Sequence, residues 1–240
     1  MYNFKWLKFL VIQATSLLDI YIDVYYKFIR KSTHTHRNTH TAKLKEVKMA
    51  TLNHSNLERI RALVREAAKS AIKTVLGSFG SEHSDKGAYI RVYHLPNLGE
   101  SYIGLIELFA AWIGGGANDN KLDKYIIVSV EKAIRLARNT GNPIPFSYLG
   151  GHLSSWESRD QMCARFRDKF GGATLVRCLV QELGPDPTHL LFSVSGLTEI
   201  GDEAVALLTA INLPWQVNMD DIHGIVAKSG NFLVKRELGY

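Results

Sequence analysis

Hydrophobic positions in the first part of the chain after the leader recur with helical spacing. From Ser55 to Val75 apolar residues fall every three or four positions with basic residues between them, which predicts a long amphipathic helix. Ser55 and Glu58 predict a capping box at its start, and residues 77–87 predict the loop that ends it. The expected inward face consists of Leu57, Ile60, Val64, Ala68, Ile72 and Val75.

Two later segments alternate apolar and polar residues, which is the pattern of half-buried strands. In residues 88–109, Ile90 and Val92 share one face, and the PNLG stretch turns the chain into a second strand. In residues 174–196 the apolar positions alternate on both sides of a GPDP turn. Each segment predicts a β-hairpin. The second hairpin places Val176, Cys178, Val180, Leu190, Phe192 and Val194 in the alternating apolar positions.

Helical periodicity returns after each hairpin. A helix from Asp119 is predicted to end near Gly141 and Pro143, and Thr198 is predicted to cap a helix that Pro214 closes. The first of these helices should point Leu122, Ile126, Val130, Ala133 and Ala137 inward. Residues 144–156 predict a loop or short strand pair, residues 157–169 a polar helix, and residues 231–238 a last strand.

The order helix, hairpin, helix, hairpin, helix predicts the fold class. Two antiparallel hairpins joined through a helix usually merge into one sheet, so we expect an α+β fold, an antiparallel sheet with packed helices of the profilin-like or PAS-like kind. We expect residues 49–240 to form this single domain.

Charge separates the first 48 residues from the rest. They hold nine of the 29 lysines and arginines and three of the 23 acids, so the whole formal charge of +6 belongs to them. The remainder has 20 basic and 20 acidic residues. A neutral body without a basic stripe argues against nucleic acid as the main partner.

The leader itself has two unusual stretches. Residues 6–28 are apolar but interrupted by Asp19 and Asp23, and residues 33–41 alternate threonine and histidine, as translation of a CA repeat would. We interpret residues 1–48 as a disordered or spurious extension from an over-extended gene model. A targeting segment or membrane anchor is the alternative, as is a metal-binding tract with ligands His34, His36 and His40.

The remaining composition points to an ordinary domain without a structural metal. Cys163 and Cys178 have no metal or redox spacing, so we expect reduced cysteines and a cytoplasmic location, with no membrane segment in residues 49–240. Residues 114–116 are three glycines without P-loop or GxGxxG spacing, so we expect a connection rather than a nucleotide cradle.

The segment FGGATLVRC, a turn, and HLLFSVSGLTEIGDEAVALL, from Phe170 to Leu208, resembles a known family. It is similar to the glycine-glycine strand and strand-to-helix junction of the GlcG/HbpS group, small domains often labelled haem-binding or haem-degrading. Lys132 and Ala133 resemble that family's Ala-x-x-Lys-Ala helix, with Val128 in place of the first alanine. The family's Arg-Met-Asp stretch is absent from LIELFAAW. The junction positions that match are Ser195, Gly196, Thr198, Asp202 and Ala204.

This resemblance implies a domain that binds a small ligand, with haem as one candidate cofactor. Two glycine-rich turns would let a ligand approach the backbone, so we expect a pocket near Gly171, Gly172, Ser195 and Gly196. Haem iron takes a His, Tyr, Cys or Met ligand. The candidate histidines are His94, His152 and His189.

Two other functions stay open on sequence grounds. In the first, Ser195 is the nucleophile of a hydrolase, although no GxSxG motif surrounds it. In the second, the chain is a homo-oligomeric binding or scaffold protein without chemistry, because tryptophan and tyrosine often anchor interfaces. The candidate interface residues are Tyr89, Tyr93, Trp112, Trp156 and Trp215.

Overall fold

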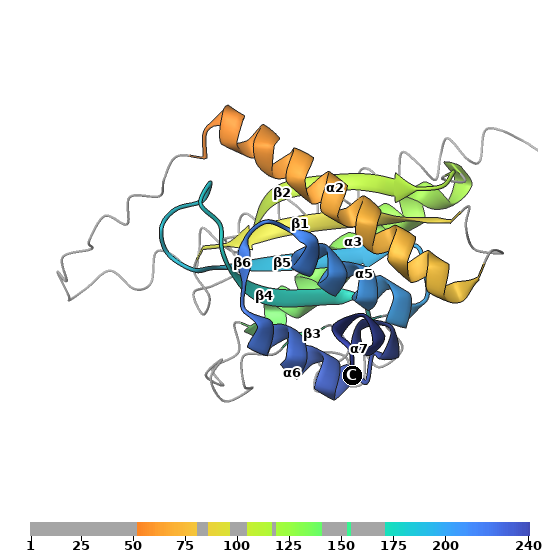
Figure 1. Cartoon of the computed structure of the whole chain (residues 1–240). Helices are drawn as coiled ribbons and strands as arrows, with labels where there is room; N and C mark the ends of the chain where they lie inside the picture. Colours follow the sequence, from red (N-terminus) through yellow and green to blue (C-terminus); the bar gives the residue numbers. More distant parts are fainter. Residues whose placement is uncertain (1–51, 81–85, 97–104, 117–118, 141–152, 155–170) are drawn as a thin grey trace, which may run out of the picture. The chain divides into compact units, whose positions relative to one another are not determined.

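The computed structural model divides by its internal contacts into two units, residues 1–48 and 49–240. It describes residues 52–80, 86–96, 105–116, 119–140, 153–154 and 171–240, all in the second unit. Its helices are α2 (His54–Phe79), α3 (Asp119–Thr140), α5 (Glu199–Asn212), α6 (Met219–Ser229) and α7 (Phe232–Leu238) (Figure 1). Its strands are β1 (Gly87–Leu95), β2 (Ile106–Gly114), β3 (Leu153–Ser154), β4 (Ala173–Leu179), β5 (Thr188–Ser195) and β6 (Gln216–Val217).

The described strands form one antiparallel sheet. Its order is β2-β1-β5-β4-β3, and β6 pairs with the end of β4. The two hairpins, β1–β2 and β4–β5, join where β1 pairs with β5, with Ile90 opposite Val194. The predicted α+β fold, an antiparallel sheet with packed helices, is therefore confirmed.

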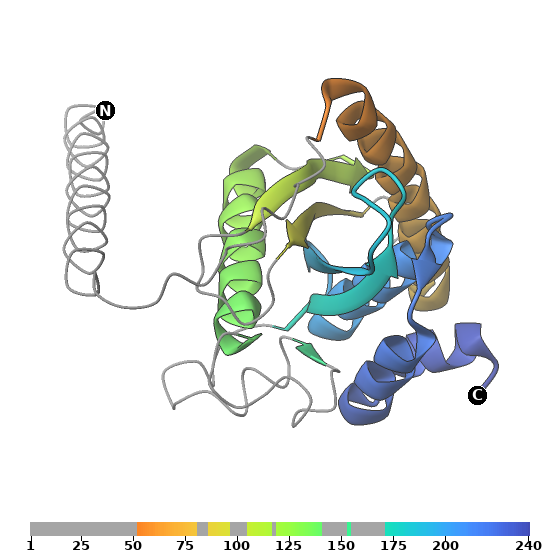
Figure 2. The ribbon, with the colours of Figure 1, turned by 90° about the vertical axis from the view of Figure 1, so that its left-hand side faces the viewer.

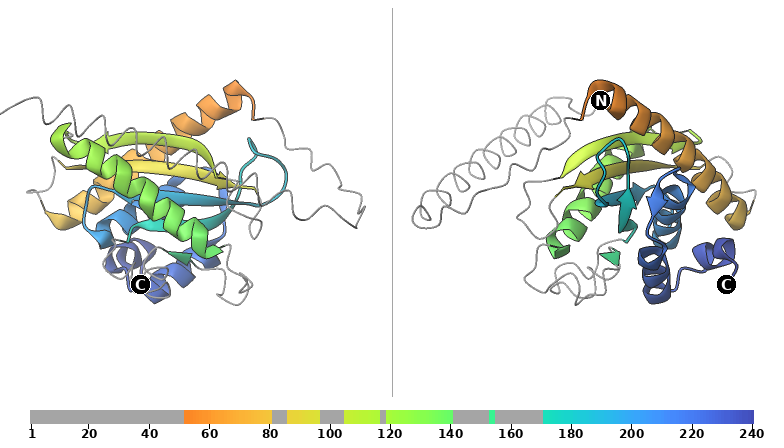
Figure 3. Two further views of the ribbon diagram at one scale, coloured as in Figure 1. Left: turned by 180° about the vertical axis from the view of Figure 1, so that it is seen from behind. Right: turned by 60° about the vertical axis from the view of Figure 1, so that its left-hand side comes forward.

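Helices cover both faces of this sheet (Figure 2). On one face α2 and α5 pack over the large core, where Ile90, Val92 and Phe192 are fully buried. On the other face α3 crosses the strands diagonally and encloses a smaller core that includes Leu136 and Leu191 (Figure 3). Successive side chains of a strand point to opposite faces of the sheet, so the same strands contribute residues to both cores.

The predicted start of the first helix is wrong by two residues. Asn53 caps α2, since its side-chain oxygen accepts from the amide of Asn56 at 2.7 Å, whereas Glu58 pairs with Arg61. The helix also runs past Gly77 to Phe79. The predicted cap of α5 is confirmed, because Thr198 accepts from the amide of Gly201 at 3.2 Å.

The inward face of α3 differs from the prediction. Ala133 and Ala137 are buried, but the predicted Leu122, Ile126 and Val130 are only half-buried. Polar residues hold the inward positions because the sheet offers them partners. Ser129 accepts from Arg91 Nε at 3.1 Å, and its carbonyl accepts from the Ser193 hydroxyl at 2.7 Å.

The tail of the chain is helical, so the predicted last strand is wrong. Asn231 caps α7 by accepting from the amide of Val234 at 3.3 Å, and the consecutive residues Leu233 and Val234 are both buried. Strand alternation would have placed them on opposite faces. Helix α6, which ends at Gly230 in the left-handed conformation with φ of +68°, had no counterpart in the prediction.

Several predictions lie outside the described residues. These include the leader (residues 1–48), the helix over residues 157–169, Cys163, and most of the loop or strand pair over residues 144–156, of which only β3 is described. Within the described part of the chain, no helix is long and apolar enough to cross a bilayer.

Candidate functional site

The exit of β5 into α5 makes a close backbone contact with the start of β1. Gly196 has φ of +149°, which favours glycine, and a Cβ there would lie 2.7 Å from the carbonyl oxygen of Gly87 and 2.8 Å from the Cα of Ala88. Gly114, at the end of β2, similarly leaves only 2.8 Å between such a Cβ and the Cα of Gly87. We call this end of the sheet, defined by Gly87, Gly114, Gly172 and Gly196, the glycine end.

A buried ion pair lies beneath the glycine end. The Lys132 ammonium is 2.7 Å from Asp202 Oδ2 and donates to the carbonyl of Val194 at 2.8 Å. The two side chains are only 1% and 4% exposed. Burial raises the pKa of Asp202, while Lys132 and the Leu197 amide, which donates to Oδ1 at 2.9 Å, act against that rise. The pair therefore ties α3 to the β5–α5 junction.

The predicted glycine pair lies directly against this ion pair. Gly172 has φ of +113°, and a Cβ there would lie 2.5 Å from the Asp202 Cβ and 3.0 Å from the Lys132 Nζ. Its carbonyl accepts from the Val194 amide at 2.9 Å, and the Gly171 amide donates to a carboxylate oxygen of Glu199 at 3.0 Å. Glycine is required at position 172 because any side chain would displace the ion pair.

The structure thus brings four predicted site residues to one place. Gly171 and Gly172 precede β4, and Ser195 and Gly196 end the neighbouring strand β5. Three of the four are buried, with Ser195 only 3% exposed, and only Gly196 lines a cavity described here.

That cavity opens at the glycine end and has a volume of about 550 Å³. The Trp112 and Tyr125 rings stack in its lining at 5.6 Å between centroids and 30° between planes. Trp112 is fixed in place, since its Nε1 donates to the Gly115 carbonyl at 2.6 Å. No lining residue is acidic. The lining comprises Leu76, Phe79, Lys86, Gly87, Trp112, Gly116, Lys121, Tyr125, Gly196, Leu197 and Thr198.

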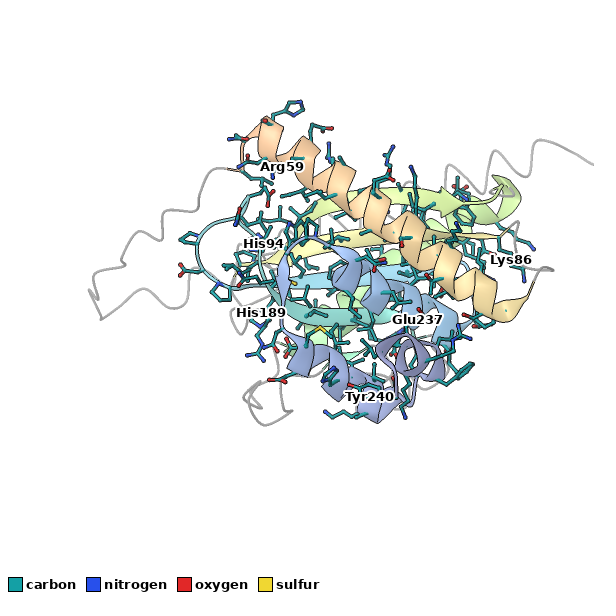
Figure 4. The ribbon with its side chains drawn as sticks, viewed as in Figure 1. Arg59, Lys86, His94, His189, Glu237 and Tyr240 are labelled. Atoms are coloured by element: carbon teal, nitrogen blue, oxygen red, sulfur yellow. The ribbon has the colours of Figure 1, made fainter. Side chains whose placement is uncertain are left out.

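The described histidine candidates lie at the opposite end of the sheet, which we call the histidine end, defined by His94 and His189 (Figure 4). In the β1–β5 register His94 lies opposite Leu190 and His189 opposite Leu95, so the two histidines alternate onto different faces. Burial lowers the pKa of His94 and lowers that of His189 to about 4. His152 lies outside the described residues.

An ion pair also lies near His189. The register places Arg177 opposite His189, and the Arg177 guanidinium donates to Asp221 at 2.8 Å. Asp221 is buried, but the Arg177 side chain is 41% exposed. This pair, unlike the one at the glycine end, therefore faces water on its cationic side.

These positions bear on the haem and hydrolase hypotheses. The lining of the 550 Å³ cavity contains no histidine, cysteine or methionine. Tyr125 is the one lining residue of a type that can ligate haem iron. Among the described residues no three His, Cys, Asp or Glu side chains are grouped to hold a metal. Ser195 is buried at the end of the sheet opposite both described candidate histidines. Neither histidine is therefore placed to activate this serine.

Sequence reasoning missed the cationic and aromatic parts of this lining. Lys86 precedes β1, and Lys121 and Tyr125 lie one turn apart on α3. Trp112 was interpreted as an interface residue. The spacing of Lys121 and Tyr125 was readable, but their approach to Trp112 depends on how α3 crosses the sheet.

The interface hypothesis also changes with the structure. Tyr93 is only 8% exposed, so the prediction that it anchors a contact from an exposed face is wrong. It belongs to the smaller core, under α3. Trp156 lies outside the described residues.

Comparisons with protein-family models, curated proteins and solved structures returned no match.

Proposed function

We propose that this protein binds a small anionic molecule with a flat apolar part, in the cavity at the glycine end. The observation that carries the proposal is the lining itself, in which the Trp112–Tyr125 stack lies beside Lys86 and Lys121 with no acidic residue. A volume of about 550 Å³ lies in the range of small-molecule sites.

The charges favour an anion. In the described part of the chain, Lys86 and Lys121 have no ion-pair partner, and Asp202, although near the β5–α5 junction, is held by Lys132. The cavity therefore keeps its positive charge for a ligand, and its aromatic wall offers a flat surface on which a ring can stack.

Membership of the GlcG/HbpS group remains part of this proposal. Lys132, Gly172 and Asp202, which stand in or beside the family-like motifs, meet at one buried point at the glycine end. Haem as the ligand has weaker support, because Tyr125 would have to supply the iron ligand. Haem is therefore a separate arm of the test.

The test uses anilinonaphthalene sulfonate, an anionic flat probe, titrated into the protein and followed by its fluorescence. We expect the Lys86→Gln/Lys121→Gln variant to bind at least tenfold more weakly than the parent. Lys124→Gln is the matched control, because Lys124 lies on α3 outside the lining and is exposed. Equal affinities for all three proteins would overturn the proposal. In the haem arm, binding should shift the Soret band of haemin, and Tyr125→Phe should alter that shift. No spectral change at stoichiometric haemin would remove haem.

A second proposal is self-association through α3. Ile127 and Ile134 are 67% and 37% exposed, and with the half-buried Val130 they follow one helical stripe. A second copy of the same stripe would cover both in a two-fold contact. Static light scattering should show a dimer or larger closed assembly that Ile127→Glu dissociates. A monomeric parent protein would remove this proposal.

A further inference from the structure

A second cavity adjoins the first one at the glycine end. Its volume is about 390 Å³, and it lies between α2 and the end of β2. Five of its lining residues follow one stripe of α2, because they recur at intervals of one or three positions, and a sixth, Gly80, caps the end of this helix. The complete lining is Lys69, Ile72, Lys73, Leu76, Gly77, Gly80, Lys86, Ile113, Gly114 and Gly115. Only Leu76 and Lys86 also line the first cavity.

Gly77 leaves this cavity open at a cost to the helix. Glycine in a helix is less favourable than alanine. A Cβ at Gly77 would meet no atom within 4 Å, and its φ lies outside the left-handed region. Neither packing nor backbone conformation therefore requires glycine at position 77. On the opposite wall, by contrast, a Cβ at Gly114 would lie only 2.8 Å from the Cα of Gly87. Among the described residues, none fills the space beside this bare position.

The chemistry of the walls is aliphatic and cationic. Ile72, Leu76 and Ile113 form the apolar surface, and no lining residue is aromatic or acidic. Among the rim lysines, Lys69 is paired with Glu66 at 2.7 Å. Lys73 and Lys86 have no ion-pair partner in the described part of the chain.

We propose that this second cavity binds the acyl chain of a fatty-acid-type carboxylate. The chain would lie along Ile72, Leu76 and Ile113, and the carboxylate would pair with Lys73 and Lys86. An aliphatic surface that ends in free ammonium groups complements such an amphiphile, whereas a simple anion would leave the apolar wall uncovered. This site shares Leu76 and Lys86 with the aromatic cavity. Lys73 and Gly77 line only this site, and Lys121 lines only the aromatic one, so variants at these positions test the two assignments separately.

The test measures decanoate binding to the full chain by isothermal titration calorimetry. We expect Gly77→Leu, which fills the cavity from an unstrained position, to weaken binding at least tenfold, and Gly77→Ala to bind within about threefold of the parent. Lys73→Gln should weaken binding about fivefold. Lys121→Gln, which changes only the aromatic cavity, should leave decanoate affinity unchanged.

Several outcomes would overturn the proposal. They are no decanoate binding to the parent, an unchanged affinity in a folded Gly77→Leu variant, decanol binding as tightly as decanoate, or complete competition by millimolar inorganic phosphate. Thermal unfolding of each variant establishes that it folds. Anilinonaphthalene sulfonate binding that responds to Lys121→Gln but not to Gly77→Leu would show that the aromatic site stands even if the acyl site fails.

Discussion

The two ends of the sheet are built from different residues, and the two cavities proposed as ligand sites lie at one of them. At the glycine end Gly87, Gly114 and Gly196 bring backbones within contact distance, and cavities of about 550 and 390 Å³ open beside them. At the histidine end His94 and His189 are themselves partly buried between neighbouring strands, and neither lines these two cavities. The candidate histidines mark one end of the sheet in the sequence, whereas the two cavities proposed as ligand sites lie at the other.

The ion pairs of the two ends differ in the same way. Lys132 and Asp202 are both enclosed, while Arg177 reaches water from its contact with Asp221. Separating an enclosed pair would leave a buried charge without its counter-charge, so the pair opposes movement of α3 away from the β5–α5 junction. The glycine end thus has both a fully buried ion pair and the two cavities proposed as ligand sites.

The largest expected effect comes from Asp202→Ala. Removing one partner of an enclosed pair leaves a buried charge, so we expect a loss of about 3–5 kcal/mol in the free energy of unfolding, measured by urea denaturation. Asp221→Ala is the comparison, and a smaller loss of about 1–3 kcal/mol is expected because Arg177 can be solvated. Equal losses would mean that the two ends do not differ as described.

Gly196→Ala should destabilise the glycine end next. A Cβ at φ of +149° would meet Gly87 and Ala88 at under 3 Å, so we expect a loss of about 1–3 kcal/mol. Urea denaturation measures it. Gly184→Ala is a partial control, because Gly184 also has a positive φ of +142° but no atom within 4 Å of a Cβ. If both variants lost the same stability, strand contact would not be the reason for glycine at position 196.

The histidine end should make stability depend on pH. The pKa of His189 is about 4 in the folded protein against 6.5 in a model peptide, so the unfolded chain binds the proton first as pH falls. The contribution of His189 to the free energy of unfolding is therefore complete above pH 6.5 and is lost progressively toward pH 4. The loss is about 1–2 kcal/mol after allowance for the partial exposure of the side chain. Urea denaturation at pH 7 and pH 4.5 measures the loss. His189→Gln should reduce the difference between the two pH values, and an unchanged difference would assign it to other groups.

The smallest expected effect is an increase in stability on substitution of Gly77. Gly77→Ala should raise the free energy of unfolding by about 0.5–1 kcal/mol, since the helix gains a better helix former and a Cβ meets no atom. Differential scanning calorimetry should show a higher Tm. A lower Tm would mean that position 77 does need glycine for the fold, which removes the argument that the residue is kept for a ligand.

Much of the fold could be predicted because alternation and periodicity report burial directly. The faces of β1, β4 and β5 were correct, since each strand alternates over a well-formed core on the α2 side. The predicted face of α3 is correct at Ala133 and Ala137. It misses the inward positions Ser129, Lys132 and Arg135, because a hydrophobic pattern does not count polar residues. Their burial depends on partners such as Val194 and Ser193, which come from a distant part of the chain.

Of the candidate site, the sequence predicts the strand ends that come together but not the side chains that line the cavity. Gly171, Gly172, Ser195 and Gly196 do come together, because they flank two strands that pair with each other. The cavity wall could not be predicted, since Lys86, Trp112 and Lys121 belong to three elements whose side chains meet only after α3 packs on the sheet. The sequence also does not show that His94 and His189 lie at the sheet end away from Gly171, Gly172, Ser195 and Gly196, because that depends on the strand register.

The pairing of β1 with β5 has a consequence for kinetics. Tyr89 pairs with Ser195 and Leu95 with His189, so this seam joins positions roughly 100 residues apart. The aromatic cavity is lined from both sides of the seam, by Gly87 on one and Gly196 on the other. A bound ligand would therefore act as a clamp between the early and late halves of the chain, and would lengthen the lifetime of the folded protein by slowing the separation of these two strands.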